Sequence, residues 1–313
     1  MKAAIIGSGN VGKAVFHDLQ HVPFIDQIAL VGRNQSAVMA EVMDARDAAI
    51  LRGETGPKLF HGGYEATRGA DLIIYTAGSS KVKTDRMEML KDNLQITEEI
   101  FSQVMQYNRE AIILCLTNPL DVITMKIQQV TGIDPRRVIG SGTLLESARL
   151  IRFVAELLEV SDKSVHINVV GEHGATAVAL LSSVRIMGMT LEEYLKNVTE
   201  SDLVLNIDHL HEALKNEPFR IFYGKGYTST GVSATACRIA GAIAADSREI
   251  LPVSTVLQGE YGITGVALSV PSVIGRNGVE DIREAPMDPE EKAAFLASAQ
   301  AIRQAAISGG FAL

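Results

Sequence analysis

Residues 3–12 read Ala3-Ala4-Ile5-Ile6-Gly7-Ser8-Gly9-Asn10-Val11-Gly12, an apolar run followed at once by three glycines in a G-x-G-x-x-G pattern. The apolar run is typical of a strand that is buried on both faces of a parallel sheet. After the glycines, apolar residues recur at the three- and four-residue spacing of a helix, and a second apolar run follows at 28–31. Residues 1–34 therefore predict one strand, one phosphate-binding loop and one helix.

Each glycine of this loop has a physical task in the predicted unit. Gly7 makes the tight turn, Gly9 lets a pyrophosphate approach the main chain, and Gly12 lets helix and strand pack closely. The helix that starts around Asn10 and Val11 supplies free N–H groups and the positive end of its dipole. We therefore predict that these five residues bind a dinucleotide. The alternative is a glycine-rich turn with no ligand.

The second predicted strand lacks the acidic residue that follows such a loop by about twenty residues and binds the adenosine ribose. Gly32 stands at that place, and Arg33 is next to it. A small residue followed by arginine suits a ribose 2′-phosphate, which favours NADP(H). The other interpretation is that Arg33 is a solvent-exposed loop residue and that NAD(H) binds through other contacts. Both cofactors stay open.

Length and composition bound the class of protein. A chain of 313 residues, 47% of them hydrophobic, can bury a substantial core and is expected to form two lobes. A formal net charge of −8 argues against a nucleic-acid partner. No apolar run reaches the roughly 18 residues that span a bilayer, and the N-terminal strand leaves no room for a signal peptide. We therefore expect a cytoplasmic protein with no membrane partner.

The two cysteines predict neither a disulfide nor a metal site. Cys115 lies in an apolar strand and Cys237 in a helix, which fits buried thiols. The chain has no zinc-type spacing of cysteine and histidine. We expect no metal.

The first half of the chain alternates strands with helices. Apolar runs predict strands at 59–60, 70–77 and 111–116, and helical spacing predicts helices at 36–51 and 86–107. This order predicts an α/β fold with a right-handed, doubly wound (Rossmann), mostly parallel sheet. Ligands of such sheets bind at the carboxyl ends of the strands, where the glycine loop should meet residues 78–86 and 117–119.

The second half, from about residue 140, has a different texture. We expect helices at 143–158, 191–214, 228–250 and 288–307, a strand at 165–170, an extended segment at 177–184, and antiparallel strands at 253–257 and 266–270. We therefore divide the chain into a dinucleotide-binding domain, residues 1–140, and a mixed α+β substrate domain, residues 141–313. Because no linker separates the two, they should share an interface.

Candidate chemical groups follow the predicted strands. Glu146 and Arg149 stand three residues apart in a predicted helix, hence on the same face. His173 stands between glycines at the end of a predicted strand, in Gly171-Glu172-His173-Gly174. Arg86 begins a helix after an exposed polar loop.

Six motifs, in this order and over nearly the whole chain, resemble the L-lactate/L-malate dehydrogenase family, and most nearly its L-2-hydroxyisocaproate dehydrogenase branch. They are Gly7-Ser8-Gly9-Asn10-Val11-Gly12, Thr117-Asn118-Pro119-Leu120-Asp121-Val122, Gly140-Ser141-Gly142-Thr143 with Glu146-Ser147-Ala148-Arg149, Gly171-Glu172-His173-Gly174, Gly226-Tyr227-Thr228-Ser229, and Ile274-Gly275-Arg276. Together they are specific, and no one of them would be. The resemblance implies reversible hydride transfer between a nicotinamide cofactor, NAD by family default, and a 2-hydroxy acid.

By this resemblance, His173 is the acid–base group, since imidazole titrates near neutrality and can return the proton in the reverse direction. The alternative is a loop histidine satisfied by the main chain. Glu146 matches the carboxylate that fixes the histidine tautomer and stabilises imidazolium. The family usually has aspartate there, and the longer glutamate puts the pairing geometry in question. The alternative is an ordinary carboxylate on the helix surface.

The resemblance also implies which residues hold the substrate. Arg149 matches the clamp on the substrate carboxylate, a task that suits the guanidinium fork, and its alternative is an ion pair with Glu146. Arg86 matches the loop arginine that polarises the carbonyl when the loop closes, although this loop, counted from Gly78 of the cofactor crevice, is one residue shorter than usual. Asn118 should hydrogen-bond near the nicotinamide ribose and the substrate, or else form an Asn-Pro turn.

The resemblance indicates the substrate class at two positions, the loop around Val82 and Thr228. Malate enzymes carry an arginine in the mobile loop, and here that register falls on Lys81 or Val82. Val82 facing the substrate favours an apolar side chain, whereas Lys81 or Lys83 could accept a second carboxylate. Thr228, where malate enzymes tend to have alanine, favours monocarboxylates.

These residues predict an NAD(P)-dependent L-2-hydroxyacid dehydrogenase acting on lactate or a longer 2-hydroxy/2-oxo monocarboxylic acid. The alternative within enzymes is malate dehydrogenase. The alternative from another class is a non-catalytic dinucleotide-binding sensor. The resemblance implies a homo-oligomer, either a tetramer or a dimer.

Overall fold

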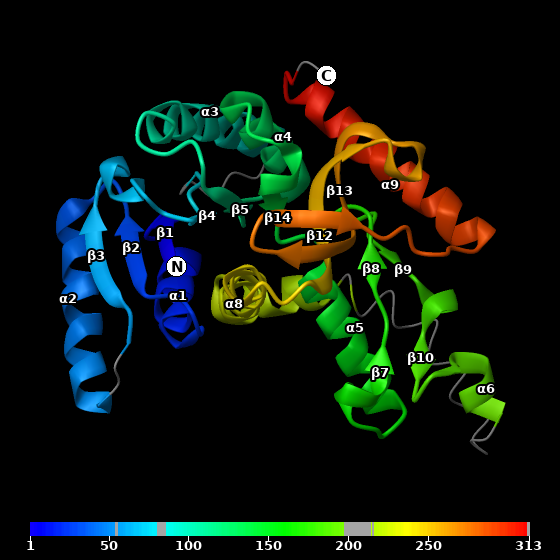
Figure 1. Cartoon of the computed structure of the whole chain (residues 1–313). Coiled ribbons are helices and arrows are strands. Elements are labelled where there is room, and N and C mark those ends of the chain that lie inside the picture. Colours follow the sequence, from blue (N-terminus) through cyan, green and yellow to red (C-terminus); the bar gives the residue numbers. More distant parts are fainter. Residues whose placement is uncertain (54–55, 80–85, 197–213, 215, 312–313) are drawn as a thin grey trace.

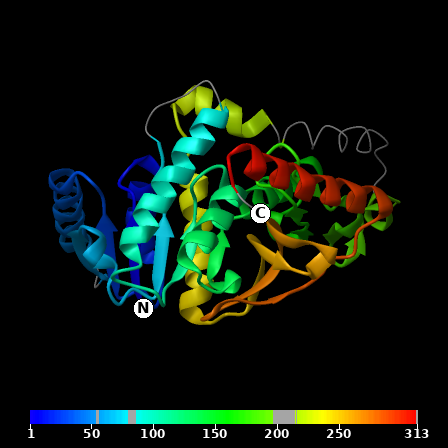
Figure 2. The same ribbon diagram turned by 90° about the horizontal axis from the view of Figure 1, so that it is seen from above.

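A computed structural model describes residues 1–53, 56–79, 86–196, 214 and 216–311 of the chain, with the backbone alone for residues 86–87. The blue and cyan N-terminal elements lie on one side of the molecule, and the orange strands with the red C-terminal helix lie on the other (Figures 1 and 2). Within these described ranges, no helix is long and apolar enough to cross a membrane.

The N-terminal half forms the predicted parallel sheet. Its strands are β1 (Lys2–Ile6), β2 (Gln27–Val31), β3 (Lys58–Gly62), β4 (Leu72–Tyr75), β5 (Ile112–Cys115) and β6 (Val138–Gly140). They pair in the order β3-β2-β1-β4-β5-β6, all parallel. This is the strand order of a dinucleotide-binding sheet, so the predicted Rossmann fold class is confirmed.

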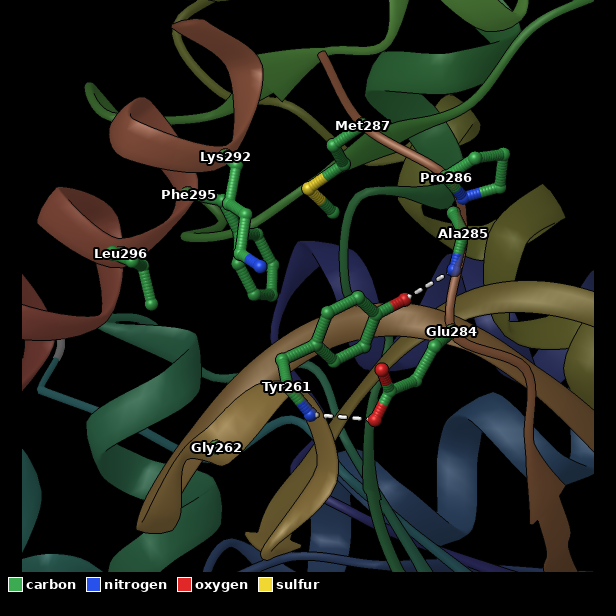
Figure 3. Close-up of a pocket in the computed structure, with 9 residues that line it drawn as sticks. All are labelled: Tyr261, Gly262, Glu284, Ala285, Pro286, Met287, Lys292, Phe295 and Leu296. Atoms are coloured by element: carbon green, nitrogen blue, oxygen red, sulfur yellow. Dashed lines mark hydrogen bonds between the residues drawn. The ribbon is translucent and has the colours of Figure 1, made fainter. Parts of the chain in front are cut away.

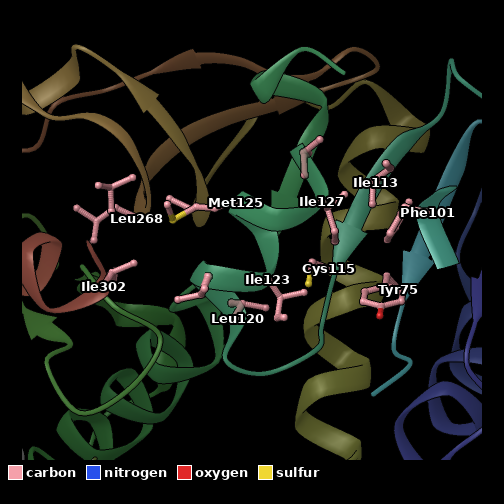
Figure 4. Packing of buried hydrophobic residues seen from close by; sticks show 14 of the residues in the cluster. Tyr75, Phe101, Ile113, Cys115, Leu120, Ile123, Met125, Ile127, Leu268 and Ile302 are labelled. Carbon is pink, nitrogen blue, oxygen red and sulfur yellow. The ribbon is translucent and has the colours of Figure 1, made fainter. Parts of the chain in front are cut away.

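Both faces of this sheet are buried, as the apolar runs predicted. Successive residues of β1 point to opposite faces, so that Ala3 and Ile5 join one hydrophobic cluster and Ala4 and Ile6 join the other. Four helices follow strands of this half: α1 (Asn10–Asp18), α2 (Gln35–Arg52), α3 (Arg86–Val104) and α4 (Leu120–Thr131). Figure 4 shows the cluster that α3 and α4 share with β4 and β5, around Tyr75, Phe101 and Ile123.

The second half extends the same sheet. Strand β12 (Glu249–Gln258) pairs antiparallel with β6 at Ser254↔Gly140, and β13 (Thr264–Gly275) and β14 (Gly278–Ile282) follow it. The antiparallel pair expected at 253–257 and 266–270 is confirmed, although both strands are longer. Sequence patterns did not predict that these strands would join the parallel sheet, which has nine strands in the described part of the chain.

The helices of this half are α5 (Leu144–Leu157), α6 (Leu191–Lys196), α8 (Thr230–Ala245) and α9 (Pro289–Ser308), and residues 216–225 are also helical. The expected helix at 288–307 is confirmed, and Asp288 caps it in a reciprocal capping box with Glu291. The expected helix at 143–158 is confirmed as α5. Of the helix expected at 191–214, the part at 197–213 lies outside the described residues.

Three predicted boundaries in this half are wrong. The strand expected at 165–170 is two strands, because β7 (Val165–His166) pairs with β10 (Arg185–Ile186), whereas β8 (Val169–Val170) pairs with β9 (Val178–Ala179). The segment expected to be extended at 177–184 becomes a 3₁₀ turn after β9. The helix expected to reach residue 250 ends at Ala245, because Asp246 takes the left-handed conformation (φ 51°) that stops it.

Candidate active site

Two glycines of the phosphate loop are required by packing. Gly7 has φ +117°, and a Cβ there would lie 2.4 Å from Oγ1 of Thr76. A Cβ on Gly12 would lie 1.9 Å from the carbonyl oxygen of Gly7. Thr76 fastens the other side of the turn by donating to the carbonyls of Ile6 and Gly7 at 3.1 and 3.2 Å. The turn at Gly7 and the start of α1 therefore pack closely, as the sequence predicted.

Gly9 is different, because no atom lies within 4 Å of the position of its Cβ. It is the N-cap of α1, and no side chain accepts a hydrogen bond from this helix end in the cap position. Asn10 is exposed and Val11 half-buried in the first turn. Open space beside bare N–H groups fits a pyrophosphate, so the residues present fit a dinucleotide.

At the end of β2, the space beside Gly32 is filled. A Cβ there would lie 2.6 Å from Oγ of Ser8 and 2.8 Å from Cγ2 of Val38. A larger side chain at this place would require the side chains of Ser8 and Val38 to move. Arg33 is exposed, and its charge reaches Tyr64, whose pKa is raised by burial and lowered in part by Arg33.

The carboxyl ends of β4 and β5 lie at the same edge of the sheet as the phosphate loop. A Cβ on Gly78 would lie 3.3 Å from both Asn93 and Thr117, so this turn is tightly packed. Asn93, on α3, accepts the N–H of Ser79 at 2.7 Å and donates to the carbonyl of Asn118 at 2.7 Å. The side chain of Asn118 is exposed at the crevice end of β5. Asn93 was not singled out in the sequence, since an asparagine inside a helical pattern gives no local signal.

His173 and Glu146 come together as predicted. Nδ1 of His173 lies 3.0 Å from Oε1 of Glu146, in an approach too oblique for a well-aligned hydrogen bond. Burial alone would lower the pKa of His173, but the negative charges of Glu146 and Asp121 raise it to about 9. Burial alone would raise the pKa of Glu146, but the imidazolium of His173 holds it below its usual value. The pair is therefore charged at neutral pH.

Local contacts explain why these two residues meet. The hydroxyl of Thr143 donates to the carbonyl of Val169 at 2.5 Å, and the hydroxyl of Ser147 accepts the N–H of Val169 at 2.9 Å. These bonds fasten the first turn of α5, which carries Glu146, to β8, which leads into His173.

Asp121 is a second carboxylate beside His173. It is 3% exposed, its Oδ2 accepts the main-chain N–H of His173 at 2.9 Å, and its Oδ1 accepts the hydroxyl of Ser254 at 2.6 Å. Burial raises the pKa of Asp121 to about 6, against the opposing effects of Ser254 and His173. In the sequence, Asp121 belongs to the motif Thr117–Val122, and no role was predicted for it.

Arg149 lies on the same helix and is 8% exposed. Among the described residues, the carboxylate of Glu217 lies 3.6 Å from Nε of Arg149, and the charge of Arg149 also acts on Glu146. The role of Arg149 stays a prediction. Glu217 also contacts Arg152 at 2.5 Å. Glu217 lies far from α5 in sequence and was not predicted.

The remaining candidates are only partly described. Val82, Lys81 and Lys83 lie outside the described residues, and Arg86 begins α3 with its side chain outside them. Thr228 is half-buried just before α8.

Away from this crevice, a pocket of about 450 Å³ lies between the tip of the β12–β13 hairpin and the start of α9 (Figure 3). Its lining residues are Tyr261, Gly262, Glu284, Ala285, Pro286, Met287, Lys292, Phe295 and Leu296. It contains none of the candidate residues. In the described ranges, no group of His, Cys, Asp and Glu side chains is arranged to hold a metal ion.

Comparison with known proteins agrees with the motifs. Residues 1–140 match the family model of the lactate/malate dehydrogenase NAD-binding domain, and residues 143–312 match that of the α/β C-terminal domain. An L-lactate dehydrogenase of Nitratidesulfovibrio vulgaris is 36% identical over 305 residues, covering 96% of this chain and 97% of the relative. An L-lactate dehydrogenase of Acetivibrio thermocellus is 32% identical over 291 residues, covering 93% and 91%.

The solved structures agree on the fold. A ligand-bound minor L-lactate dehydrogenase of Enterococcus mundtii superposes with a TM-score of 0.91 at 31% identity, covering 98% of each chain. A lactate dehydrogenase from a deep-sea metagenome superposes with a TM-score of 0.93 at 23% identity, covering 99% of each chain.

Proposed function

The chain belongs to the lactate/malate dehydrogenase family, and on this premise we propose that it is an NAD(P)-dependent L-2-hydroxyacid dehydrogenase acting on 2-hydroxy/2-oxo monocarboxylic acids. The observation that carries the proposal is the pair of half-buried His173 and buried Glu146, whose Nδ1 and Oε1 lie 3.0 Å apart. A proton carrier with a fixed carboxylate partner is what the interconversion of an alcohol and a ketone requires. The curated relatives named L-lactate dehydrogenase support the same reaction.

A nicotinamide dinucleotide held by the loop at Gly7, Gly9 and Gly12 would supply or accept the hydride at C2 of the substrate. In the reducing direction His173 donates the proton to the carbonyl oxygen, and in the oxidising direction it removes the hydroxyl proton. Because Nδ1 faces Glu146, Nε2 is the nitrogen that exchanges this proton. Glu146 stabilises the imidazolium form, as the raised pKa of His173, about 9, indicates.

The substrate carboxylate is assigned to Arg149. Two terminal nitrogens of one guanidinium match two carboxylate oxygens in a plane, and burial of Arg149 strengthens that contact. Arg86 is assigned to polarise the carbonyl as its loop closes and excludes water. Asn118 is assigned to the nicotinamide ribose and the substrate.

The apolar side of the substrate is assigned to Val82 and Thr228, which favours lactate or a branched 2-hydroxy acid over malate. For the cofactor, the packed Gly32 and the exposed Arg33 are compatible with a 2′-phosphate. NAD(H) remains the family default. We propose a homo-oligomer, by resemblance to the family.

Steady-state rates with pyruvate, 2-oxoisocaproate and oxaloacetate, each with NADH and with NADPH, test the proposal. A monocarboxylate should give the highest kcat/KM. A preference for oxaloacetate would make the chain a malate dehydrogenase. Cofactor binding without turnover on any of the three acids would favour the sensor alternative.

A further inference from the structure

Asp121 is a buried carboxylate that the proposed reaction does not use. It stands in the first turn of α4, directly after the Asn118-Pro119 turn, and its side chain points toward the segment that follows β8. Both carboxylate oxygens are engaged, one by the main-chain N–H of His173 at 2.9 Å and one by the hydroxyl of Ser254 at 2.6 Å. A carboxylate buried to this degree is costly unless its bonds and charges are well placed.

The segment around His173 is held from three sides. On one side, Ser298 of α9 accepts the N–H of Glu172 at 2.8 Å. On another side, Asp121 of α4 accepts the next N–H, that of His173. On the third side, the carboxylate of Glu146 of α5 lies 3.0 Å from Nδ1 of the imidazole and attracts it by charge. Asp121 therefore fixes the main chain at His173 by a hydrogen bond, and its carboxylate also carries a negative charge.

Among the described residues, His173 and Glu172 act on Asp121 by their charges, and Asp121 acts in turn on the thiol of Cys115 at the end of β5. Glu146 and Arg149 of α5 act on His173. Burial, to which the charge of Asp121 adds, raises the pKa of Cys115 to about 12, so this thiol is neutral at physiological pH. His173 is therefore the cation that both Asp121 and Glu146 stabilise, whereas Arg149 opposes it.

We propose that Asp121 is a positioning residue for proton transfer: it anchors the main chain of His173 and, as a second negative charge behind the imidazole, favours its protonated form. This inference deepens the proposed function and rests on it for its meaning in catalysis. The geometry of Asp121, His173 and Ser254 does not depend on it. The carboxylate of Glu146 thus lies beside the imidazole of His173, and that of Asp121 accepts its main-chain N–H.

The test is Asp121→Asn, which keeps the shape. The amide oxygen still accepts the N–H of His173, and the amide nitrogen faces Ser254, whose hydroxyl can accept. The measured quantity is the pKa of His173, followed by NMR on histidine-labelled protein with His173→Asn to assign its signal among the seven histidines. Removing a neighbouring charge should lower the pKa of His173 by roughly one unit. An unchanged pKa would overturn the proposal.

Ser254→Ala is the matched control. It removes one hydrogen bond from Asp121 but leaves the charge, because Asp121 still ionises well below the pKa of His173, about 9. The pKa of His173 should stay near that of the wild type. Equal shifts in both variants would mean that the hydrogen-bond network acts and the charge does not, which contradicts the proposal.

A measurement on the wild type covers the case in which Asp121→Asn does not fold. The His173 signal should show a small second inflection near pH 6, where Asp121 titrates. A curve with a single inflection would contradict the charge coupling.

Catalysis separates this inference from the proposed function. If the wild type reduces 2-oxo acids, the rate of reduction should be lost at a lower pH in Asp121→Asn than in the wild type. The difference in pH should match the decrease in the pKa of His173. If no 2-oxo acid is turned over, the proposed function fails, while the NMR shift still decides on Asp121.

Discussion

The phosphate loop and the surroundings of His173 are formed in opposite ways. The phosphate loop consists of six neighbouring residues, and its shape depends on the absence of side chains at three of them. Gly7 and Gly12 permit close packing, and Gly9 leaves open space. Around His173, the proposed proton-transfer residue, polar and charged side chains come from distant parts of the chain, and the hydrogen-bonded pair of Asp121 and Ser254 is 133 residues apart. Substitutions in the phosphate loop should affect packing and cofactor affinity. Substitutions around His173 should affect charge and the pH dependence of the rate.

The largest effect is expected from His173→Asn. Loss of a positioned acid–base group should lower kcat by about 10²–10⁴-fold. The dissociation constant of the reduced cofactor should stay close to that of the wild type, because the phosphate loop is untouched. Stopped-flow rates and fluorescence titration of the cofactor measure the two quantities. A matching loss of cofactor affinity would show that the phosphate loop and the surroundings of His173 are not independent.

Glu146→Gln should come next, with kcat for reduction at neutral pH lowered roughly 10²-fold. The amide cannot stabilise imidazolium, so the pKa of His173 falls from about 9. Reduction needs protonated His173, so its rate is lost as pH rises through that pKa, and this loss should occur at lower pH in the variant. A loss at the wild-type pH would remove Glu146 from this role.

The same pair also affects stability. Because the folded-state pKa of His173 is raised above 6.5, the usual value for a free imidazole, its stabilising contribution is complete below pH 6.5 and is lost as pH rises through about 9. The difference in Tm between wild type and Glu146→Gln should therefore shrink across this range. A constant difference would mean that packing alone is responsible.

At the phosphate loop, Gly12→Ala and Gly9→Ala form a matched pair. The Cβ on Gly12 meets a backbone oxygen at 1.9 Å, so this variant should lose about 1–3 kcal/mol of unfolding free energy. The Cβ on Gly9 meets nothing within 4 Å, so that variant should keep its stability and lose cofactor affinity about tenfold or more. Thermal unfolding and cofactor titration separate the two. Equal destabilisation of both would contradict the division of tasks.

Arg33→Asp should give the smallest effect. The substitution removes a cation that suits a 2′-phosphate and adds a group that repels it, so the ratio of kcat/KM for NADPH to that for NADH should fall roughly tenfold. Arg33→Ala serves as the control that removes the charge only. No change in the ratio in either variant would leave Arg33 as a solvent-exposed residue and NAD as the cofactor.

The same contrast explains what the sequence could predict. The phosphate loop was readable because strand, glycines and helix are contiguous, and each leaves a local pattern. His173, Glu146 and Arg149 were reached through motifs, and the structure brings all three to one place. Their roles stay predictions.

The rest depends on contacts between distant segments. Asn93 supports Asn118 across 25 residues, and Glu217 reaches Arg149 from a helix far along the chain. The pairing of β12 with β6 joins Ser254 to Gly140. No local periodicity encodes such contacts, because each depends on the folded arrangement of both partners.

Transfer of deuterium tests the central claim most directly. The wild-type protein is given reduced cofactor labelled with deuterium on either face of nicotinamide C4, together with a 2-oxo monocarboxylic acid, and the product is analysed by NMR and chiral chromatography. The account predicts an L-2-hydroxy acid with deuterium at C2 from one labelled face, formed at a rate that His173→Asn lowers by about 10²–10⁴-fold. A D-product, a product without label from either face, or no product with any 2-oxo acid would contradict it.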